Sequence, residues 1–197
     1  QAVKLIDAFS PQAAFLKSNS VQVRESLEQA RNCSFPPELK AYIDTTIPKE
    51  TIAFQGVGNP IVLRVASELS WRMTGYNINP ETNEKINTWN DDWFLIANDG
   101  GEPIIVDLNE QKNVSTVYSA MQGQTGWDFY PIADSIGQFL LCAAAIEHAM
   151  NFPGMGESLD EDFNLIGAAA SWLFPFLKQY AGSYYDEWAS VFENFDQ

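Results

Sequence analysis

The sequence predicts an α+β fold, in which N-terminal helices precede a central antiparallel β-meander sheet packed on a helix, followed by a C-terminal helical extension. Apolar residues recur at helical spacing in the first and last thirds of the chain, whereas short apolar runs separated by turn residues fill the middle. The chain has 197 residues, of which 46% are hydrophobic. This length and composition favour a single hydrophobic core.

The first third of the chain reads as helical. Apolar residues follow helical spacing over residues 2–16, and Ser10-Pro11 divides this run into two short pieces. A second helix is predicted from Val21 to Arg31, and Pro37 suits the first turn of a third. Asn59-Pro60 could begin a further helix through Leu69, although β-branched residues crowd that stretch.

The middle of the chain predicts strands. A strand from Trp71 to Tyr76 and a tight reversal at residues 79–83 come first. Two apolar runs, 93–97 and 103–108, then flank Asn98-Asp99-Gly100-Gly101, whose residues tolerate the positive φ angles of hairpin turns. Further strands are expected over 114–120 and from Trp127 to Tyr130, which completes the meander.

Two capping patterns mark the later helices. Ser135 and Gln138 form a capping box for a helix that runs to about Met150, and Ser158 and Glu161 form a second. The second box predicts a helix over 159–180, kinked by Pro175, and a last helix follows over 184–195. We therefore divide the chain into an α+β domain, residues 1–150, and a helical extension, residues 151–197, packed on the same domain.

The net charge of −15 is unevenly distributed. Residues 1–85 contain nine acidic and nine basic residues, whereas residues 86–197 contain seventeen acidic residues against Lys112 and Lys178. Such a surface repels phosphate, so we expect no direct nucleic-acid partner and no anionic membrane partner, and basic proteins are favoured. A role of the acidity in solubility alone remains an alternative.

No apolar stretch reaches the 18 or more residues that a membrane-spanning helix needs, so no membrane association is expected. We expect a cytoplasmic location, although a sequence that begins at Gln1 leaves open whether a secretion signal was removed. Cys33 and Cys142 lack the close spacing of a zinc or redox motif, and we expect both to be buried thiols.

The central stretch resembles a known family in the order of its motifs. These motifs are Trp93-Phe94-Leu95-Ile96-Ala97, Asn98-Asp99-Gly100-Gly101, Pro103-Ile104-Ile105-Val106-Asp107-Leu108, Val117-Tyr118, Trp127, Ile132-Ala133, Ser135 and Phe139-Leu140. Together with Phe35-Pro36-Pro37-Glu38-Leu39 upstream, they resemble the SUKH superfamily, which includes bacterial toxin-immunity proteins and fungal regulators of cell-wall glucan synthesis. The resemblance covers roughly residues 35–150. Glu102 stands where the family commonly has Asp in a Gly-Asp-Pro turn, so this chain keeps the charge on a longer side chain.

The resemblance implies an α+β domain that binds a partner protein, and it implies no reaction. Residue patterns agree, because no nucleophile elbow occurs and the single histidine, His148, suits a structural role at the end of a helix. Gly56-Val57-Gly58 lacks the remainder of a phosphate-binding loop, and Asp160-Glu161-Asp162 lacks calcium-loop spacing. We therefore predict no catalytic residue, no metal and no cofactor.

Acidic and aromatic residues at the ends of the predicted strands are the candidate partner-binding site. They are Trp89, Asp91, Asp92, Asp99, Glu102, Trp127 and Asp128. The carboxylates would steer a basic partner, and the tryptophans would anchor it from partly exposed positions.

Three functions stay open at this point. The first is an immunity-type protein that occludes a basic toxin, for example a nuclease. The second is a regulatory scaffold for cell-wall or envelope synthesis that docks through the aromatic C-terminal helices. The third is a carbohydrate-active enzyme that uses paired carboxylates among Asp99, Glu102, Asp107 and Asp128.

Overall fold

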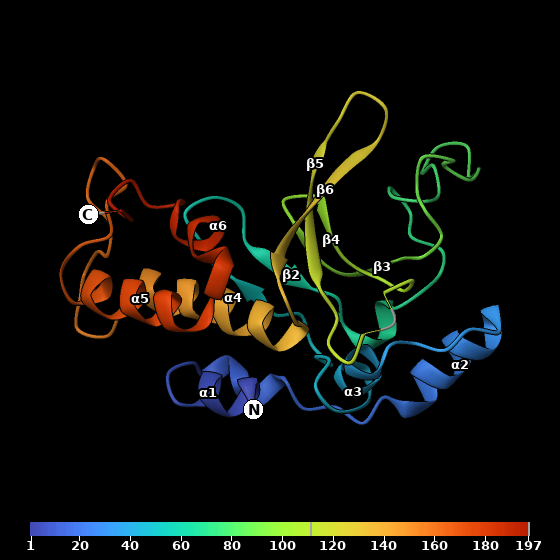
Figure 1. Ribbon diagram of the computed structural model, residues 1–197, viewed down its shortest axis with the longest axis horizontal. Coiled ribbons are helices and arrows are strands. Elements are labelled where there is room, and N and C mark those ends of the chain that lie inside the picture. Colours follow the sequence, from blue (N-terminus) through green and yellow to red (C-terminus); the bar gives the residue numbers. More distant parts are fainter. Residues whose placement is uncertain (111, 197) are drawn as a thin grey trace.

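A six-stranded antiparallel sheet lies at the centre of the protein, in a computed structural model that describes residues 1–110 and 112–196 (Figure 1). Its strands are β1 (Ala53–Phe54), β2 (Ile61–Leu63), β3 (Trp93–Asp99), β4 (Glu102–Asp107), β5 (Val117–Gln122) and β6 (Trp127–Ala133). Each strand pairs with the next one along the chain, in the order β1 to β6. The predicted meander is confirmed, and β1 and β2 extend it at one edge.

Helices precede and follow the sheet, which confirms the α+β class. They are α1 (Ala2–Asp7), α2 (Val21–Arg31), α3 (Pro37–Thr45), α4 (Ile136–Met150), α5 (Gly167–Tyr180) and α6 (Tyr185–Ala189), with 3₁₀ turns at Pro11–Phe15, Ala66–Glu68 and Gly182–Tyr184. In Figure 1, α5 lies alongside α4, and the β5–β6 hairpin extends away from both helices. None of the helices among the described residues is long and apolar enough to cross a membrane.

The β3–β4 hairpin forms where the sequence predicts it. Gly100 and Gly101 take φ angles of +55° and +108°, a region that other residues rarely adopt. Position 100 also has no room for a side chain, since a Cβ atom there would lie 2.0 Å from the side-chain nitrogen of Asn59. The turn therefore brings the β1–β2 loop against the end of β3.

The apolar helix α4 covers one face of the sheet, here called the helix face. The hydroxyl of Ser135 accepts the Gln138 backbone N–H at 3.0 Å, as the capping pattern predicts, but the Gln138 side chain returns its bond to the N–H of Asp134. All residues of α4 from Phe139 to Ile146 are buried. They belong to one core cluster that also contains residues of strands β3–β6, of the N-terminal helices and of the extension.

The opposite face of the sheet, the loop face, is covered by the segment 71–90. Met73, Tyr76 and Trp89 from this segment form a second cluster with Leu95 and Ile105 of the sheet. The predicted strand at 71–76 is wrong, because only isolated bridges form there, whereas the predicted reversal is present and is stabilised by the Asn79 side chain. Both faces of the sheet are therefore covered over much of their area.

Three predicted helices differ from the structure. The stretch after Pro60 forms β2 and a 3₁₀ turn, because its β-branched residues suit a strand. The helix predicted over 159–180 begins only at Gly167, since the Asp160 carboxylate accepts the N–H groups of Asp162 and Asn164 and holds a turn. The last helix ends at Ala189, well before the predicted end at 195.

Candidate functional site

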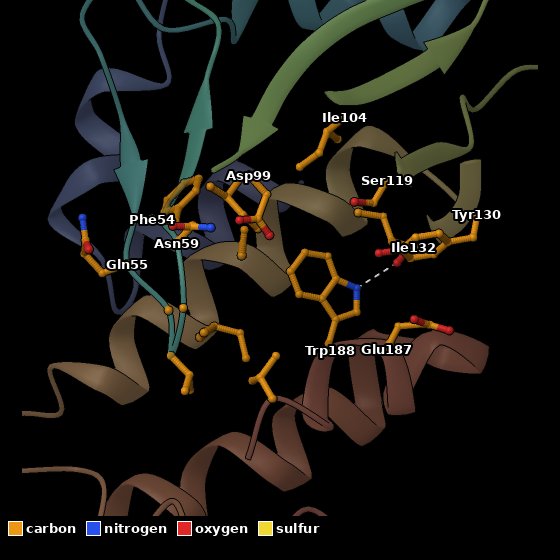
Figure 2. Close-up of a pocket in the computed structure, with 17 residues that line it drawn as sticks. Phe54, Gln55, Asn59, Asp99, Ile104, Ser119, Tyr130, Ile132, Glu187 and Trp188 are labelled. Carbon is orange, nitrogen blue, oxygen red and sulfur yellow. Dashed lines mark hydrogen bonds between the residues drawn. The ribbon is translucent and has the colours of Figure 1, made fainter. Parts of the chain in front are cut away.

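A pocket of about 270 Å³ opens on the helix face of the sheet (Figure 2). Its walls come from the β1–β2 loop, the strands β3 to β6, helix α4 and the segment around α6. Ile104 and Ile132 of the sheet and Ile146 of α4 supply apolar surface. The pocket therefore lies where the α+β domain meets the C-terminal extension.

Trp188 of α6 forms the wall that the extension contributes. It is 7% exposed, and its indole N–H donates to the carbonyl oxygen of Ile132 at 2.8 Å. Phe139 packs against the same ring, with ring centroids 6.1 Å apart. The bond and the ring contact hold the indole against the sheet.

Two polar groups face the pocket without a partner. The hydroxyl of Ser119 is on a residue only 8% exposed, and within the described part of the chain it makes no hydrogen bond. The carboxylate of Asp99, at the end of β3, points toward the ring of Trp188 in Figure 2 and likewise accepts no hydrogen bond from a described residue. Burial, and then the nearby charge of Glu102, raises the pKa of Asp99.

Alternation along the strands places three carboxylates on the helix face. Glu102 lies two residues before Ile104, and Asp128 lies four before Ile132, so both share the face of these core residues. Asp99 is the direct cross-strand partner of Glu102. This acidic face, defined by Asp99, Glu102 and Asp128, borders the pocket.

The acidic face has no cationic neighbour within salt-bridge distance among residues 1–110 and 112–196. Of the described residues that line the pocket, none is basic, and Glu187 of α6 adds a further exposed carboxylate at the rim. Asp128 is exposed and lies over Gly123, where a Cβ atom would come within 2.5 Å of its carboxylate. A negative potential therefore persists over this end of the sheet.

Asp91 and Asp92 are not part of this face. They precede β3, at the opposite end of the strand from Asp99, which corresponds to about 20 Å at 3.3 Å per residue. Asp91 pairs with Lys85 at 2.7 Å, and Arg31 donates to its backbone carbonyl. The expectation of one acidic patch that includes all five carboxylates is wrong, because the strand separates two groups.

The predicted tryptophan anchors also differ from expectation. Trp89 is only 3% exposed and packs among Tyr76, Trp93 and Phe129 on the loop face, so a partly exposed anchor at Trp89 is wrong. Trp127 is half-buried in the same cluster and faces away from Asp128. Both side chains complete the second core, and neither lies on the acidic face.

The remaining residues considered for catalysis or metal binding are His148, the two cysteines and the acidic clusters. His148, in the last turn of α4, packs against Phe9, Phe152 and Trp172, and burial lowers its pKa. Within the described ranges, no group of three His, Cys, Asp or Glu residues could hold a metal ion. Cys142 is buried and Cys33 is half-buried, and both thiols are free.

Several pocket residues were missed from sequence. Ser119 and Tyr130 carry no motif, and their place is visible only from the register that pairs them across β5 and β6. Trp188 and Glu187 lie in a helix that the sequence analysis assigned to the extension, far from the predicted site. The sequence predicts a last helix over 184–195, but no local pattern places Trp188 of that helix against the sheet.

The fold and this site define an α+β meander domain with an acid-rimmed pocket on the helix face of its sheet. The family model of the SMI1 / KNR4 family (SUKH-1) matches residues 22–142, which is more than half of the chain, so the protein belongs to this family. Domains of this family are protein-interaction domains. No curated protein and no solved structure gives a significant match.

The family match runs from α2 into α4 and therefore excludes α5 and α6. Most of the pocket lies inside the matched range, but five lining residues lie beyond it, namely Ala143, Ile146, Glu187, Trp188 and Val191. The pocket is thus built on the family's sheet and closed by elements outside the match.

Proposed function

We propose that the protein is a non-catalytic protein-binding domain of the immunity type, which neutralises a basic toxin by binding and occluding it. The observation that supports this function best is the acidic face, where Asp99, Glu102 and Asp128 lie on one surface and form no ion pair with any residue that the structure describes. Membership of a family of protein-interaction domains supports the same conclusion.

Charge complementarity gives a reason for a basic partner. Uncompensated carboxylates on a rigid sheet attract a cationic surface over distances up to a Debye length, about 8–10 Å at physiological salt. Nuclease toxins fit this requirement, because an active site that binds phosphate is positively charged. Occupation of such a site by the acidic face would exclude nucleic acid.

Affinity capture tests this function with a matched pair of variants. The full chain is immobilised and challenged with lysate of the source organism at low and high salt, and retained proteins are identified and assayed for nuclease or other toxic activity. The reversal Asp99→Lys with Glu102→Lys should lose the partner, whereas Asp91→Lys with Asp92→Lys, at the other end of β3, should retain it.

The salt dependence of capture shows whether charge attraction or apolar contact retains the partner. A retained protein should be basic, should dissociate at high salt, and should lose its activity when the wild-type chain is added. Retention that is indifferent to salt and to reversal of the acidic face would contradict the proposal, since apolar contacts would then dominate.

A second candidate function is a regulatory scaffold for cell-wall or envelope synthesis. It is favoured by the half-buried aromatic residues Trp172 and Phe176, which stack at 4.8 Å on α5, outside the family match. For a scaffold of this kind, Phe176→Ala should weaken capture of the partner and reversal of the acidic face should not.

A further inference from the structure

We propose that the pocket beside Asp99 receives one lysine or arginine side chain of the partner protein. This inference rests on the proposed function and names the group that the site recognises. The volume of about 270 Å³ lies just below the range of roughly 300–1,000 Å³ usual for sites of drug-sized ligands. A single long side chain suits this space.

The walls match the two parts of such a side chain. Lysine and arginine place an aliphatic stem on apolar surface and keep the charged head near polar groups. Ile104, Ile132 and the ring of Trp188 offer the apolar surface, and the carboxylate of Asp99 lies beside them. An anionic side chain would meet only like charge here, and a purely apolar one would leave Asp99 desolvated without a partner.

Ser119 supplies a second polar group to the pocket. The hydroxyl of Ser119 faces the pocket and makes no hydrogen bond to a described residue, and it is not among the buried polar atoms without a partner, so it is open to a ligand or to water in the pocket. Its lone pairs can accept an N–H from an ammonium or a guanidinium group. A bound cation would therefore satisfy both Ser119 and Asp99.

Burial of Asp99 is consistent with this assignment. Desolvation and the charge of Glu102 raise its pKa in the free protein, and a cation in contact would stabilise its ionised form. A positively charged ligand would therefore offset the cost of ionising the partly buried Asp99 carboxylate.

Nuclear magnetic resonance of the full chain tests the inference through the indole N–H signal of Trp188, which lies in the pocket wall. The probes are blocked tripeptides Gly-Lys-Gly and Gly-Arg-Gly, with Gly-norleucine-Gly as the uncharged control. We expect a saturable shift of the Trp188 signal with the lysine or the arginine peptide and none with the norleucine peptide. Asp99→Asn should weaken binding about tenfold, as loss of a hydrogen bond to a charged group does.

Asp91→Asn is the matched control, because Asp91 lies at the opposite end of β3 from Asp99, outside the acidic face, and does not line the pocket. It should leave the peptide affinity unchanged. Equal shifts with the norleucine peptide, or an Asp99→Asn variant that binds as tightly as wild type, would overturn the inference. Binding of n-butylamine tighter than that of the lysine peptide would also overturn it, because the site would then select a free amine.

The outcomes distinguish this inference from the proposed function. If reversal of the acidic face abolishes capture of the basic partner while the Trp188 signal ignores both cationic peptides, only the pocket assignment fails. If the peptides bind and no basic partner depends on the acidic face, the proposed function fails and the assignment of a partner side chain fails with it.

Discussion

The indole N–H of Trp188 donates to the carbonyl oxygen of Ile132 at 2.8 Å, across 56 positions of sequence. Ile132 belongs to the last strand of the meander, and Trp188 belongs to a short helix of the extension. Because the indole ring also forms a pocket wall, this single bond ties the position of the extension to the shape of the candidate site.

Replacement of Trp188 by Phe tests this connection. The ring is largely kept, but the carbonyl of Ile132 loses its donor in a buried setting, so we expect a loss of about 1–3 kcal/mol in the free energy of unfolding. Urea denaturation measures the change. An unchanged m-value would show that the folded and unfolded states keep their difference in exposed surface.

Trp172→Phe is the control, since Trp172 is half-buried and its indole N–H makes no hydrogen bond within the described residues. It should cost clearly less than Trp188→Phe. Equal losses for the two variants would mean that ring volume, and not the bond to Ile132, accounts for the effect.

Local signals made much of the fold predictable. The hairpin followed from Gly100 and Gly101, which supply positive φ angles, and the start of α4 followed from Ser135, whose hydroxyl caps a backbone N–H. The helix expected from residue 159 failed because the Asp160 side chain competes for the same N–H groups that a helix would use. The spacing of apolar residues does not reveal whether this segment forms a helix or the turn held by Asp160.

The site was predictable only in part. Asp99, Glu102 and Asp128 were selected from sequence and do share a face, because strand alternation has a fixed period of two. Trp89 was misplaced because its neighbours in sequence are polar, whereas its neighbours in space are the aromatic residues of the loop face. Ser119 and Trp188 enter the pocket through tertiary packing, for which no local pattern exists.

Asp99→Asn should make the protein more stable at neutral pH. Burial and the charge of Glu102 raise the folded-state pKa of Asp99 above its ordinary value of 3.8, so ionisation opposes folding. The cost is absent below pH 3.8 and fully present above the raised pKa. We expect a gain of up to about 1 kcal/mol at pH 7, after allowance for solvent screening, that vanishes near pH 3.5. Urea unfolding at the two pH values measures it, and a gain of equal size at both would contradict a charge effect.

Glu28→Gln should have the opposite sign. Burial acts to raise the pKa of Glu28, but the hydrogen bonds from Phe35 N–H, Arg24 and Lys40 outweigh it, so the folded-state pKa falls below 4.5. The carboxylate therefore stabilises the fold above pH 4.5, and this contribution is lost as the pH falls through the lowered pKa.

We expect Glu28→Gln to lose about 2 kcal/mol at pH 7, with a difference from wild type that narrows below pH 4.5. The same urea measurements serve for this variant and for Asp99→Asn. A loss that grows in acid would be inconsistent with stabilisation by the ionised form.

A chain that ends at residue 150 should not fold cooperatively, although it contains the whole segment matched by the family model. Truncation removes four side chains that are 0% exposed and belong to the same core cluster as α4, namely Leu165, Leu173, Leu177 and Phe192. Burial of a large apolar side chain contributes about 1.5–3 kcal/mol, so these four account for roughly 6–12 kcal/mol. That range is comparable with the entire stability of a typical domain, about 5–15 kcal/mol.

Thermal unfolding followed by near-ultraviolet circular dichroism measures the effect of the truncation. The truncated chain should lack a sigmoidal transition, whereas Phe163→Ser in the full chain, at a side chain 55% exposed, should keep the wild-type midpoint. A sharp transition in the truncated chain would show that the sheet and α4 fold alone. In that case the extension would close the pocket without being needed for the core to fold.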